Sequence, residues 1–398
     1  MRVLFYEPNH TGHHFAYLAR MLPGFIELPV EVALATTPEA VASHEFEMTL
    51  KQYEDRIEVL PSCRPLIKRA PLRNSWRRCA DLASVVKQWK PDHVCVVYAD
   101  GIWQVLSATK ALGFNLLPQG PTYEAWMYRG GFTYPDATSR RQQRNKRLFQ
   151  RFLKQGVFAR IHFDDELVLE FTRRLPPTPT EVVLPPNPVR YAEVPSRDDA
   201  RRRLDLPREA TIVSCLGMAD HRKGVHLAMA AIQQLASTAG DRPHVRLFIG
   251  GPQSDAIREL LTEPVWQNLV EAGTILTADR FLSEQDMLDA AAASDLLLAP
   301  YFKHSGRSSI ILWAAAVGRP VVAVDRGCIR YVVEHEQLGA VCNVEDAEVF
   351  ASAIRLRLEQ PWTDEDRQRV RKYAQWHSIE NYQQLCSACV RQRLEAGQ

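Results

Sequence analysis

The chain has 398 residues, of which 46% are hydrophobic and 24% are charged, and its formal net charge is +2. This length favours two domains over one, and the near-neutral charge excludes a molecule that binds polyanions over its whole surface. No run reaches the roughly 18 apolar residues that a membrane span requires. The first ten residues, MRVLFYEPNH, lack the layout of a signal peptide, so we expect a cytoplasmic protein.

The first half of the sequence alternates between short apolar runs and amphipathic segments. Strands are expected at residues 2–7, 30–36, 57–60, 93–98, 115–118 and 160–163, and helices lie between them, for example at 14–21 and 77–89. Alternation of this kind predicts a doubly wound α/β domain, which we place at residues 1–185.

A proline-rich segment follows at residues 175–195, and we assign residues 186–209 to a semi-rigid linker and lead-in. A second alternating series predicts another α/β domain at residues 210–375. Its strands are expected at residues 211–217, 245–251, 273–277, 296–300 and 320–324. The last segment, 376–398, reads as a helix that packs back on the first domain. Two such domains predict a central cleft between them, where ligands commonly bind.

The most informative stretch is residues 294–325, SDLLLAPYFKHSGRSSIILWAAAVGRPVVAVD. A buried strand, a polar loop at 304–309, a small-residue helix at 310–317 and a second apolar run follow one another. Ligands of parallel sheets lie beyond the carboxyl ends of the strands, so the loop is expected to face a ligand.

This block resembles the C-terminal domain of the retaining, nucleotide-sugar-dependent glycosyltransferases of the GT-B fold, family 4 (group 1). The matching pieces are Ser294-Asp295, Ala299-Pro300, the loop 305–309 and the run 313–323, with further matches at 201–207, Gly217…Lys223-Gly224, 248–252 and 376–382. The resemblance covers the C-terminal half well and the N-terminal half loosely. It implies two Rossmann-like domains facing a central cleft, and transfer of a sugar to a hydroxyl of a glycan, glycolipid or small metabolite, with retention.

The resemblance also assigns the residues that would hold the donor. Lys223 matches the family's lysine and would stabilise the departing nucleoside diphosphate. The family's arginine is replaced by Met218, and either Arg222 or Arg307 is a candidate for its role. The expected donor-binding residues are Gly12, Gly217, Arg222, Lys223, Gly251, Arg280, Phe281, Gly306, Arg307, Ser308 and Ser309. Family members usually require no metal, so no cofactor or metal site is expected.

The first strand-to-helix turn, residues 7–14, carries a glycine and two adjacent histidines. Gly12 would let the backbone approach the donor diphosphate, and the helix that follows offers free N–H groups to an anion. His13 is a candidate catalytic residue and His14 a candidate acceptor contact. The alternative is an ordinary strand-to-helix turn.

Departures from the family pattern at four positions together keep a second function open. The family's two glutamates, eight residues apart, correspond to Ser305 and Trp313. Carboxylates accept hydrogen bonds from sugar hydroxyls, whereas an indole can only donate. A non-catalytic GT-B protein, acting as a binding or partner subunit in glycan assembly, is therefore the alternative to an enzyme. A sugar-nucleotide epimerase on the same fold is a third interpretation.

Acceptor contacts are expected from the loops that follow two strands of the first domain. Tyr123, Glu124 and Trp126 would lie in a loop after the strand at 115–118, where they either line an acceptor pocket or simply pack. Asp100 follows the strand at 93–98 and is another candidate.

Residues 139–160 hold eight basic residues and no acidic one. Arg140, Arg144, Arg147, Arg151 and Lys154 share one face at helical spacing, and Leu148, Phe149, Phe152 and Leu153 share another. Such a helix either lies on an anionic membrane surface or packs its apolar face on the sheet, and the two interpretations are compatible. Peripheral contact with the inner face of a membrane is therefore a candidate, while no motif indicates nucleic acid.

Eight cysteines are scattered along the chain without metal-ligand spacing. Only Cys386 and Cys389 form a CxxC pair, inside the helical tail. Free thiols in a reducing compartment are the simplest interpretation.

Overall fold

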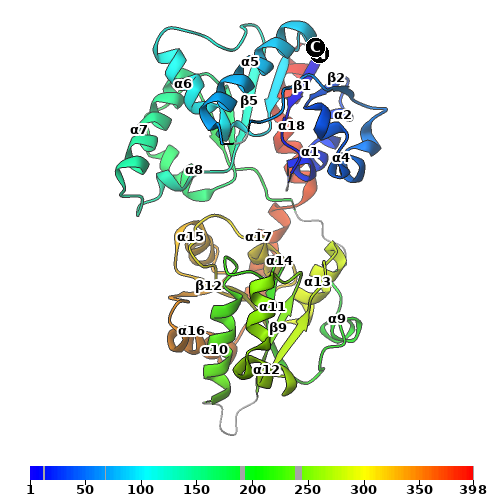
Figure 1. The fold of residues 1–398 in the computed structure, drawn as a ribbon, viewed down its shortest axis with the longest axis vertical. Coiled ribbons are helices and arrows are strands. Elements are labelled where there is room, and N and C mark those ends of the chain that lie inside the picture. Colours follow the sequence, from blue (N-terminus) through cyan, green and yellow to red (C-terminus); the bar gives the residue numbers. More distant parts are fainter. Residues whose placement is uncertain (12–13, 68, 189–192, 238–243, 398) are drawn as a thin grey trace. The chain divides into compact units, whose positions relative to one another are not determined.

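A computed structural model describes residues 1–11, 14–67, 69–188, 193–237 and 244–397. The chain divides into two compact units (Figure 1). Unit 1 comprises residues 1–188 together with 379–398, and unit 2 comprises residues 189–378. Each unit is an α/β domain with its own parallel sheet.

Unit 1 is built on a seven-stranded sheet in the order β3-β2-β1-β4-β5-β6-β7, in which all neighbours pair in parallel. The strands are β1 (Arg2–Tyr6), β2 (Glu31–Ala35), β3 (Glu58–Leu60), β4 (His93–Val96), β5 (Thr122–Met127), β6 (Arg160–Phe163) and β7 (Glu181–Val183). The chain runs from β1 toward one edge and then returns to β4 on the other side. The strand order therefore reverses between β1 and β4, which is where such sheets bind ligands.

Helices cover both faces of this sheet. The main ones are α1 (His14–Met21), α2 (Pro23–Ile26), α3 (Pro38–Val41), α4 (His44–Thr49), α5 (Pro71–Trp89), α6 (Trp103–Ala111), α7 (Arg140–Gln155), α8 (Glu166–Arg173) and α18 (Ile379–Ala396). Successive residues of β1 enter opposite cores, because side chains alternate along a strand. Leu4 and Tyr6 pack with α5, α6, α7 and α8, whereas Val3 and Phe5 pack with α1, α2, α4 and α18.

The final helix, α18, packs on unit 1. Its residues Tyr382, Cys386 and Val390 are buried in the same core as α1 and α2. A Cβ on Gly24 in α2 would lie 2.7 Å from the carbonyl oxygen of Gln383, so the two helices are in close contact. The C-terminal residues thus complete the domain that the N-terminal residues begin.

Two sequence expectations for unit 1 are wrong. Residues 115–118 form no strand, and the strand in this region begins at Thr122, as β5. Pro118 and Pro121 lack the N–H groups that a central strand must donate, which explains the shift. The proline-rich segment also contains β7, which pairs with β6 at the edge of the sheet, where Pro-flanked strands are tolerated.

Unit 2 has a six-stranded parallel sheet in the order β10-β9-β8-β11-β12-β13. The strands are β8 (Thr211–Leu216), β9 (Val245–Gly250), β10 (Ile275–Ala278), β11 (Leu296–Ala299), β12 (Val321–Val324) and β13 (Gly339–Cys342). The first five overlap the expected strands, and β13 was not anticipated. Here the strand order reverses between β8 and β11.

The helices of unit 2 alternate with these strands (Figure 1). They are α9 (Arg197–Arg203), α10 (Val225–Ser237), α11 (Asp255–Thr262), α12 (Pro264–Glu271), α13 (Glu284–Ala293), α14 (Ser309–Ala316), α15 (Gly327–His335), α16 (Ala347–Glu359) and α17 (Asp364–Trp376). Strands β11 and β12 are buried along their whole length, as a parallel sheet covered on both faces requires. Across the described residues of both units, no helix combines the length and the apolar character that a membrane crossing demands.

Candidate functional site

The candidate site lies at the carboxyl edge of the sheet of unit 2, between β8 and β11. These strands are neighbours, with Leu296 opposite Val213 and Leu297 opposite Ser214. Because the pair is parallel, the loop that follows β8 and the loop that follows β11 leave the sheet at the same edge. The sequence pieces around Gly217 and 304–309 therefore meet.

Two glycines let these loops approach one another closely. Gly251, after β9, has φ +134°, and a Cβ there would lie 2.2 Å from the carbonyl oxygen of Gly217. Gly224, in the loop after β8, has φ +72°, and a Cβ there would lie 1.7 Å from the carbonyl oxygen of Pro300. Any larger residue would push these backbone segments apart. Both glycines therefore keep the floor of the site compact.

Lys223 and the loop after β11 form a hydrogen-bonded cluster. The Lys223 ammonium donates to the hydroxyl of Tyr301 at 2.7 Å and lies 4.8 Å from the centre of the same ring. The hydroxyl of Ser308 also donates to Tyr301, at 2.9 Å. Tyr301 is buried, so the phenol fixes one end of the half-buried lysine. These contacts fix the ammonium group at the carboxyl edge of the sheet.

The N-terminus of α14 opens next to this cation. Ser308 caps the helix by accepting a hydrogen bond from the N–H of Ile310. The carbonyl of Ser305 accepts from the N–H of Cys328, at the start of α15, at 2.8 Å. The loop between β11 and α14 is thus tied at both ends. A fixed ammonium and a helix N-terminus together form a site suited to an anion such as a phosphate.

His304 belongs to the same cluster; the sequence placed it in the loop expected to face a ligand but did not single it out as a site residue. Its ring lies 4.9 Å from the ring of Tyr301, and its Nε2 lies 3.4 Å from the carbonyl oxygen of Arg307. Burial lowers the pKa of His304, and the nearby cations of Arg222 and Lys223 lower it further, against the hydrogen bond to Arg307. Tyr301 was missed as well. The signal for both was their place directly after a buried strand, opposite Lys223.

The other predicted donor residues have varied surroundings. Arg222 is exposed, with its guanidinium 3.8 Å from Asp220, and Arg307 is half-buried in the loop before α14. Gly306 lies against His304, and Ser309 is the exposed first residue of α14. At the end of β10, Arg280 pairs through both nitrogens with Asp286, at 2.8 and 3.0 Å, and Phe281 is 79% exposed.

The positions of the family's two glutamates have structural roles here. Trp313 lies inside α14 and is only 7% exposed, so its side chain belongs to the core. Ser305 contributes the carbonyl that anchors Cys328, and a Cβ on Gly327 would lie 2.3 Å from that same carbonyl oxygen. No carboxylate replaces the two glutamates at these positions.

In unit 1, the predicted residues Gly12 and His13 lie outside the described residues. His14 begins α1, and its Nδ1 lies 2.9 Å from the Oε2 of Glu7. Asp100 accepts hydrogen bonds from the backbone N–H groups of Tyr128 and Arg129, at 2.9 and 3.0 Å. Burial raises the pKa of Asp100 to about 6, although these two bonds oppose the rise. Asp100 therefore serves to fix the end of β5.

Tyr123, Glu124 and Trp126 do not lie in a loop, because all three belong to β5. Their side chains are 7%, 0% and 1% exposed, respectively. Tyr123 donates to the carbonyl of Pro118 at 2.7 Å, Glu124 lies 2.7 Å from the Nε2 of His162, and Trp126 stacks on the same imidazole. All three side chains pack within unit 1 as part of the sheet rather than in a loop, and Tyr123 also lines a cavity at the amino edge of that sheet.

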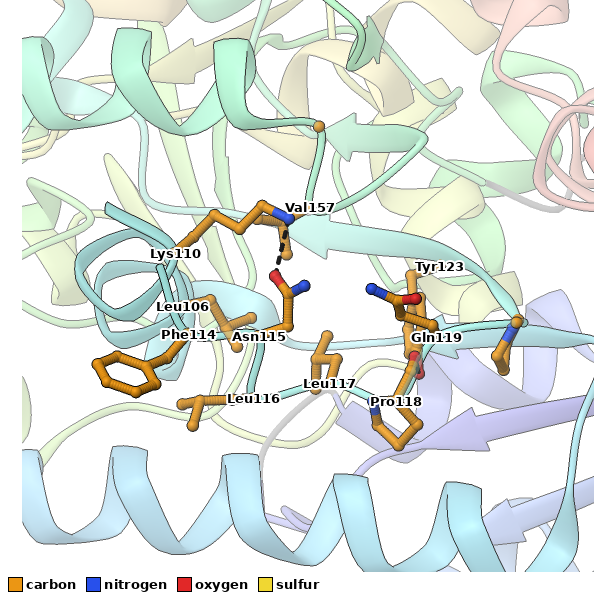
Figure 2. A pocket seen from close by; sticks show the side chains of 13 residues that line it. Leu106, Lys110, Phe114, Asn115, Leu116, Leu117, Pro118, Gln119, Tyr123 and Val157 are labelled. Carbon is orange, nitrogen blue, oxygen red and sulfur yellow. Dashed lines mark hydrogen bonds between the residues drawn. The ribbon is translucent and has the colours of Figure 1, made fainter. Parts of the chain in front are cut away.

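A cavity of about 270 Å³ does occur nearby, but at the opposite edge of the sheet (Figure 2). It is lined by residues 114–121 and Tyr123, at the start of β5, by Leu106 and Lys110 of α6, and by residues 156–157, which precede β6. Figure 2 shows Lys110 bonded across it to Asn115, at 2.7 Å. Amino edges of parallel strands are not where these folds bind their substrates, so this cavity is separate from the candidate site. Among the residues that the structure describes, no group of acidic, histidine or cysteine side chains is arranged to hold a metal ion.

Residues 210–360 match the family model described as glycosyl transferases group 1. This part of unit 2 is therefore similar in sequence to the group 1 glycosyltransferases. The chain is 27% identical over 184 residues to D-inositol 3-phosphate glycosyltransferase of Corynebacterium urealyticum, covering 46% of this chain and 42% of that protein. It is 30% identical over 166 residues to phosphatidyl-myo-inositol mannosyltransferase of Mycolicibacterium smegmatis, covering 41% and 40%. The chain thus matches less than half the length of these curated relatives.

Solved structures extend the likeness to both units. Sucrose-phosphate synthase from Thermosynechococcus elongatus aligns over 100% of both chains, with a TM-score of 0.69 and 15% identity. HepE from Anabaena, solved in complex with UDP, aligns over 98% of this chain and 100% of its own, with a TM-score of 0.67 and 16% identity. Identities this low show the fold alone, which is the GT-B fold of two Rossmann-like domains.

Proposed function

We propose that the chain transfers a sugar from a nucleotide-diphospho-sugar to a hydroxyl of a glycan, glycolipid or small metabolite, with retention at the anomeric carbon. The observation that carries this proposal is the Lys223–Tyr301–Ser308 cluster at the strand-order reversal of a group 1 glycosyltransferase domain. Retention rests on the resemblance to the family.

The cluster suits stabilisation of a leaving group. As the bond to the sugar breaks, the departing diphosphate gains negative charge, and a fixed ammonium lowers the energy of that state more than it lowers that of the bound donor. Lys223 would contact the diphosphate, supported by the N–H groups at the start of α14 and by Arg307. The proposed mechanism uses no metal, because these cations take its place.

Relatives and neighbours suggest which ligands to test first. The matched relatives are named for inositol phosphate, phosphatidylinositol and, in Rhizobium meliloti, the lipopolysaccharide core. HepE has been solved with UDP and with UDP-glucose. We therefore place UDP sugars first among donors, and phosphorylated polyols and lipid-linked glycans first among acceptors.

The first test is a thermal-shift panel with UDP, GDP, ADP and their common sugar conjugates. A ligand at 100 times its dissociation constant adds about 2.7 kcal/mol to the stability of the domain that binds it, which is readily seen. Lys223→Gln should remove most of the shift. The matched control is Lys303→Gln, since Lys303 is exposed in the same loop region with its ammonium 4.7 Å over Phe302.

The same panel separates the enzyme from a non-catalytic partner subunit. An enzyme binds one nucleotide class and consumes its sugar conjugate, whereas a partner subunit does neither and tolerates Lys223→Gln. An epimerase would release free nucleotide without any acceptor. No shift with any nucleotide, in protein that unfolds cooperatively, would refute our proposal.

We further propose that the protein acts at the inner face of a membrane, which it contacts through α7. Arg140, Arg144, Arg147 and Arg151 are all exposed and, with Thr138, Gln143 and Leu148, line a hollow of about 510 Å³. Phe149, Phe152 and Leu153, on the other side of the helix, are buried in the core of unit 1. Like charges at this spacing repel one another, so an anionic partner would reduce the electrostatic repulsion among these arginines. Each arginine near an anionic lipid surface contributes about 1 kcal/mol of attraction.

This contact can be measured by co-sedimentation with vesicles of phosphatidylcholine, with and without phosphatidylserine. Only the anionic vesicles should bind the protein, and changing the four arginines to glutamine should abolish that binding. The control removes four arginines that already have acidic partners, Arg202, Arg203, Arg367 and Arg369. Equal losses in the two variants would refute a specific role for α7.

A further inference from the structure

Three basic side chains of unit 2 lie around the ring of Tyr301. The ammonium of Lys223 lies 4.8 Å from the centre of that ring, and the guanidinium carbon of Arg222 lies 5.9 Å from it. The imidazole of His304 has its own centre 4.9 Å from the same point. Lys223 and Arg222 belong to the loop after β8, whereas His304 and Tyr301 belong to the loop after β11. The two loops therefore gather three groups able to carry positive charge around one phenol.

The loop after β11 fixes the orientation of the half-buried His304 ring. Its Nε2 lies 3.4 Å from the carbonyl oxygen of Arg307, and a Cβ on Gly306 would lie 3.3 Å from its Cε1. A carbonyl oxygen only accepts hydrogen bonds, so Nε2 carries the hydrogen of the neutral ring and the lone pair is on Nδ1. Nδ1 is therefore the atom at which His304 takes up a further proton.

The two neighbouring cations oppose a charge on His304. Burial lowers the pKa of His304, and Arg222 and Lys223 lower it further, although the hydrogen bond to Arg307 acts in the other direction. Protonation would add a third positive charge beside two that are already present. Without an anion at this place, His304 is therefore the neutral member of the three near neutral pH.

Other titratable groups of the loop after β8 lie close by. Asp220 accepts the backbone N–H of Lys223 at 2.7 Å and lies 3.8 Å from the guanidinium of Arg222, so its carboxylate is engaged within its own loop. The rings of His221 and His226 are 4.4 Å apart, and His226 lies in the first turn of α10. These two imidazoles are the ones from which a role of His304 must be distinguished by experiment.

A bound diphosphate would reverse the electrostatic balance at His304. Its negative charge would offset the repulsion from Lys223 and Arg222 and would attract a charged imidazole, and an opposite charge within about 4–6 Å favours the charged form of a group. A ligand that raises the pKa of a basic group must bind more tightly when that group is protonated. Binding of the anion and protonation of His304 would therefore favour one another.

We infer that His304 contacts the diphosphate of the donor through Nδ1 and takes up a proton from solvent as the donor binds. This inference rests on the proposed function and adds a second ligand-binding cation to Lys223. The proton forms a bond to Nδ1, the new N–H donates to a phosphate oxygen, and no bond of the donor breaks. All the residues involved belong to unit 2. Donor affinity should rise as the pH falls, through the pKa of His304 in the bound state and down to its lowered value in the free protein.

Calorimetric titrations at two pH values test this dependence. The first probe is UDP-glucose, with GDP-glucose and ADP-glucose as alternatives, because both phosphates of such conjugates are diesters whose charge is constant between about pH 6 and about pH 8.5. The wild type should bind at least about threefold more tightly at the lower pH, since each unit of pKa change is worth about tenfold in affinity. His304→Gln should bind like the wild type at the higher pH and lose the gain at the lower one. The matched control is His221→Gln, which removes an exposed imidazole of the same site and should keep the gain.

Proton uptake can also be counted directly. Repeating the titration near about pH 6.5 in buffers of different ionisation enthalpy gives the number of protons taken up per donor bound. His304→Gln should abolish this uptake, and His221→Gln should not. A wild type that binds none of the three conjugates refutes the proposed function and this inference with it. Binding without proton uptake, uptake that survives His304→Gln, or equal weakening by His304→Gln at both pH values refutes this inference alone.

Discussion

At the scale of single residues, the candidate site depends on backbone contacts that only glycine permits. The carbonyl of Gly217 lies where a Cβ on Gly251 would be, and the carbonyl of Pro300 lies where one on Gly224 would be. These contacts hold the loops after β8, β9 and β11 together beneath Lys223. The position of the cation is therefore set by residues that have no side chain.

Gly251→Ala should disrupt this arrangement. The new methyl group would lie 2.2 Å from a carbonyl oxygen at a φ of +134°, so we expect a loss of about 2–4 kcal/mol in unfolding free energy and loss of the nucleotide thermal shift. Gly113→Ala is the control, because Gly113 also has positive φ, +85°, but open space around it. Its cost should be about 1–2 kcal/mol, with nucleotide binding retained. Urea titration and thermal shift distinguish the two outcomes.

A second residue-scale prediction concerns Arg201, which is fully buried. Its guanidinium pairs with Asp295, before β11, at 2.9 Å and donates to the carbonyl of Ala293 at 2.8 Å. Arg201→Ala would leave these acceptors without their donor, and should cost about 3–5 kcal/mol of unfolding free energy. Arg202→Ala removes the exposed neighbour paired with Asp199 and should leave the urea midpoint nearly unchanged. Similar midpoints for the two variants would show that the buried pair contributes little.

At the scale of elements, α18 is joined to the sheet of unit 1 by buried polar groups. Glu124 of β5 lies 2.7 Å from His162 of β6 and 3.6 Å from His93 of β4. The thiol of Cys389 in α18 reaches the same carboxylate. Cys386 and Cys389 thus lie where α18 packs against β4, β5 and β6, and not in a segment that projects from the domain.

This cluster should make the stability of unit 1 dependent on pH. Burial lowers the pKa of His93 to about 4, despite the attraction of Glu124, whereas an unfolded histidine titrates near about 6.5. The folded state therefore binds fewer protons, and stability should fall as the pH drops from about 6.5 to about 4, by on the order of 3 kcal/mol. Burial alone would raise the pKa of Glu124, but His162 and His93 lower it below its ordinary value. The stability that the ionised Glu124 contributes is therefore lost only at a pH lower than the one at which His93 titrates.

Urea titrations of the wild type between pH 7 and pH 4, followed by a probe in unit 1, measure this effect. His93→Gln should flatten the dependence over that interval, because glutamine does not titrate. His44→Gln, at an exposed position, should leave the dependence as it is. A wild-type stability that stays constant down to pH 4 would contradict the assignment.

At the scale of the whole molecule, the chain passes twice between its two units, once after residue 188 and again after residue 378. Unit 1 needs both the first 188 residues and the last 20, because α18 covers one face of its sheet. Unit 2 contains the residues that match the group 1 family model, 210–360, and the cation cluster around Lys223. A ligand that binds the cluster should therefore stabilise unit 2 in particular.

Hydrogen exchange with and without UDP tests that expectation. Backbone amides at residues 217–224 and 301–309 should become more protected, as should the strands β8 and β11 that carry them, while the strands of unit 1 should change little. Lys223→Gln should cancel the protection, and Lys303→Gln should not. Protection confined to unit 1 would show that the nucleotide binds there and would contradict its assignment to the Lys223 cluster of unit 2.

The sequence by itself determined the fold class, most of the strands and the segments that form the candidate site. Buried parallel strands appear as short apolar runs, and the order of those runs around Lys223 and residues 304–309 matched a known domain. These are local signals, since each is carried by adjacent residues.

Only the tertiary structure decided which polar residues come together. Tyr301 and His304 join Lys223, and Glu7 joins His14, through contacts between segments that lie apart in the sequence. The sequence predicted a loop at Glu124 and Trp126 because two prolines precede β5. Both residues are buried, and that burial depends on α18, more than 250 residues later in the sequence. Composition and spacing record what a segment prefers by itself, whereas burial and hydrogen-bond partners are set by long-range packing.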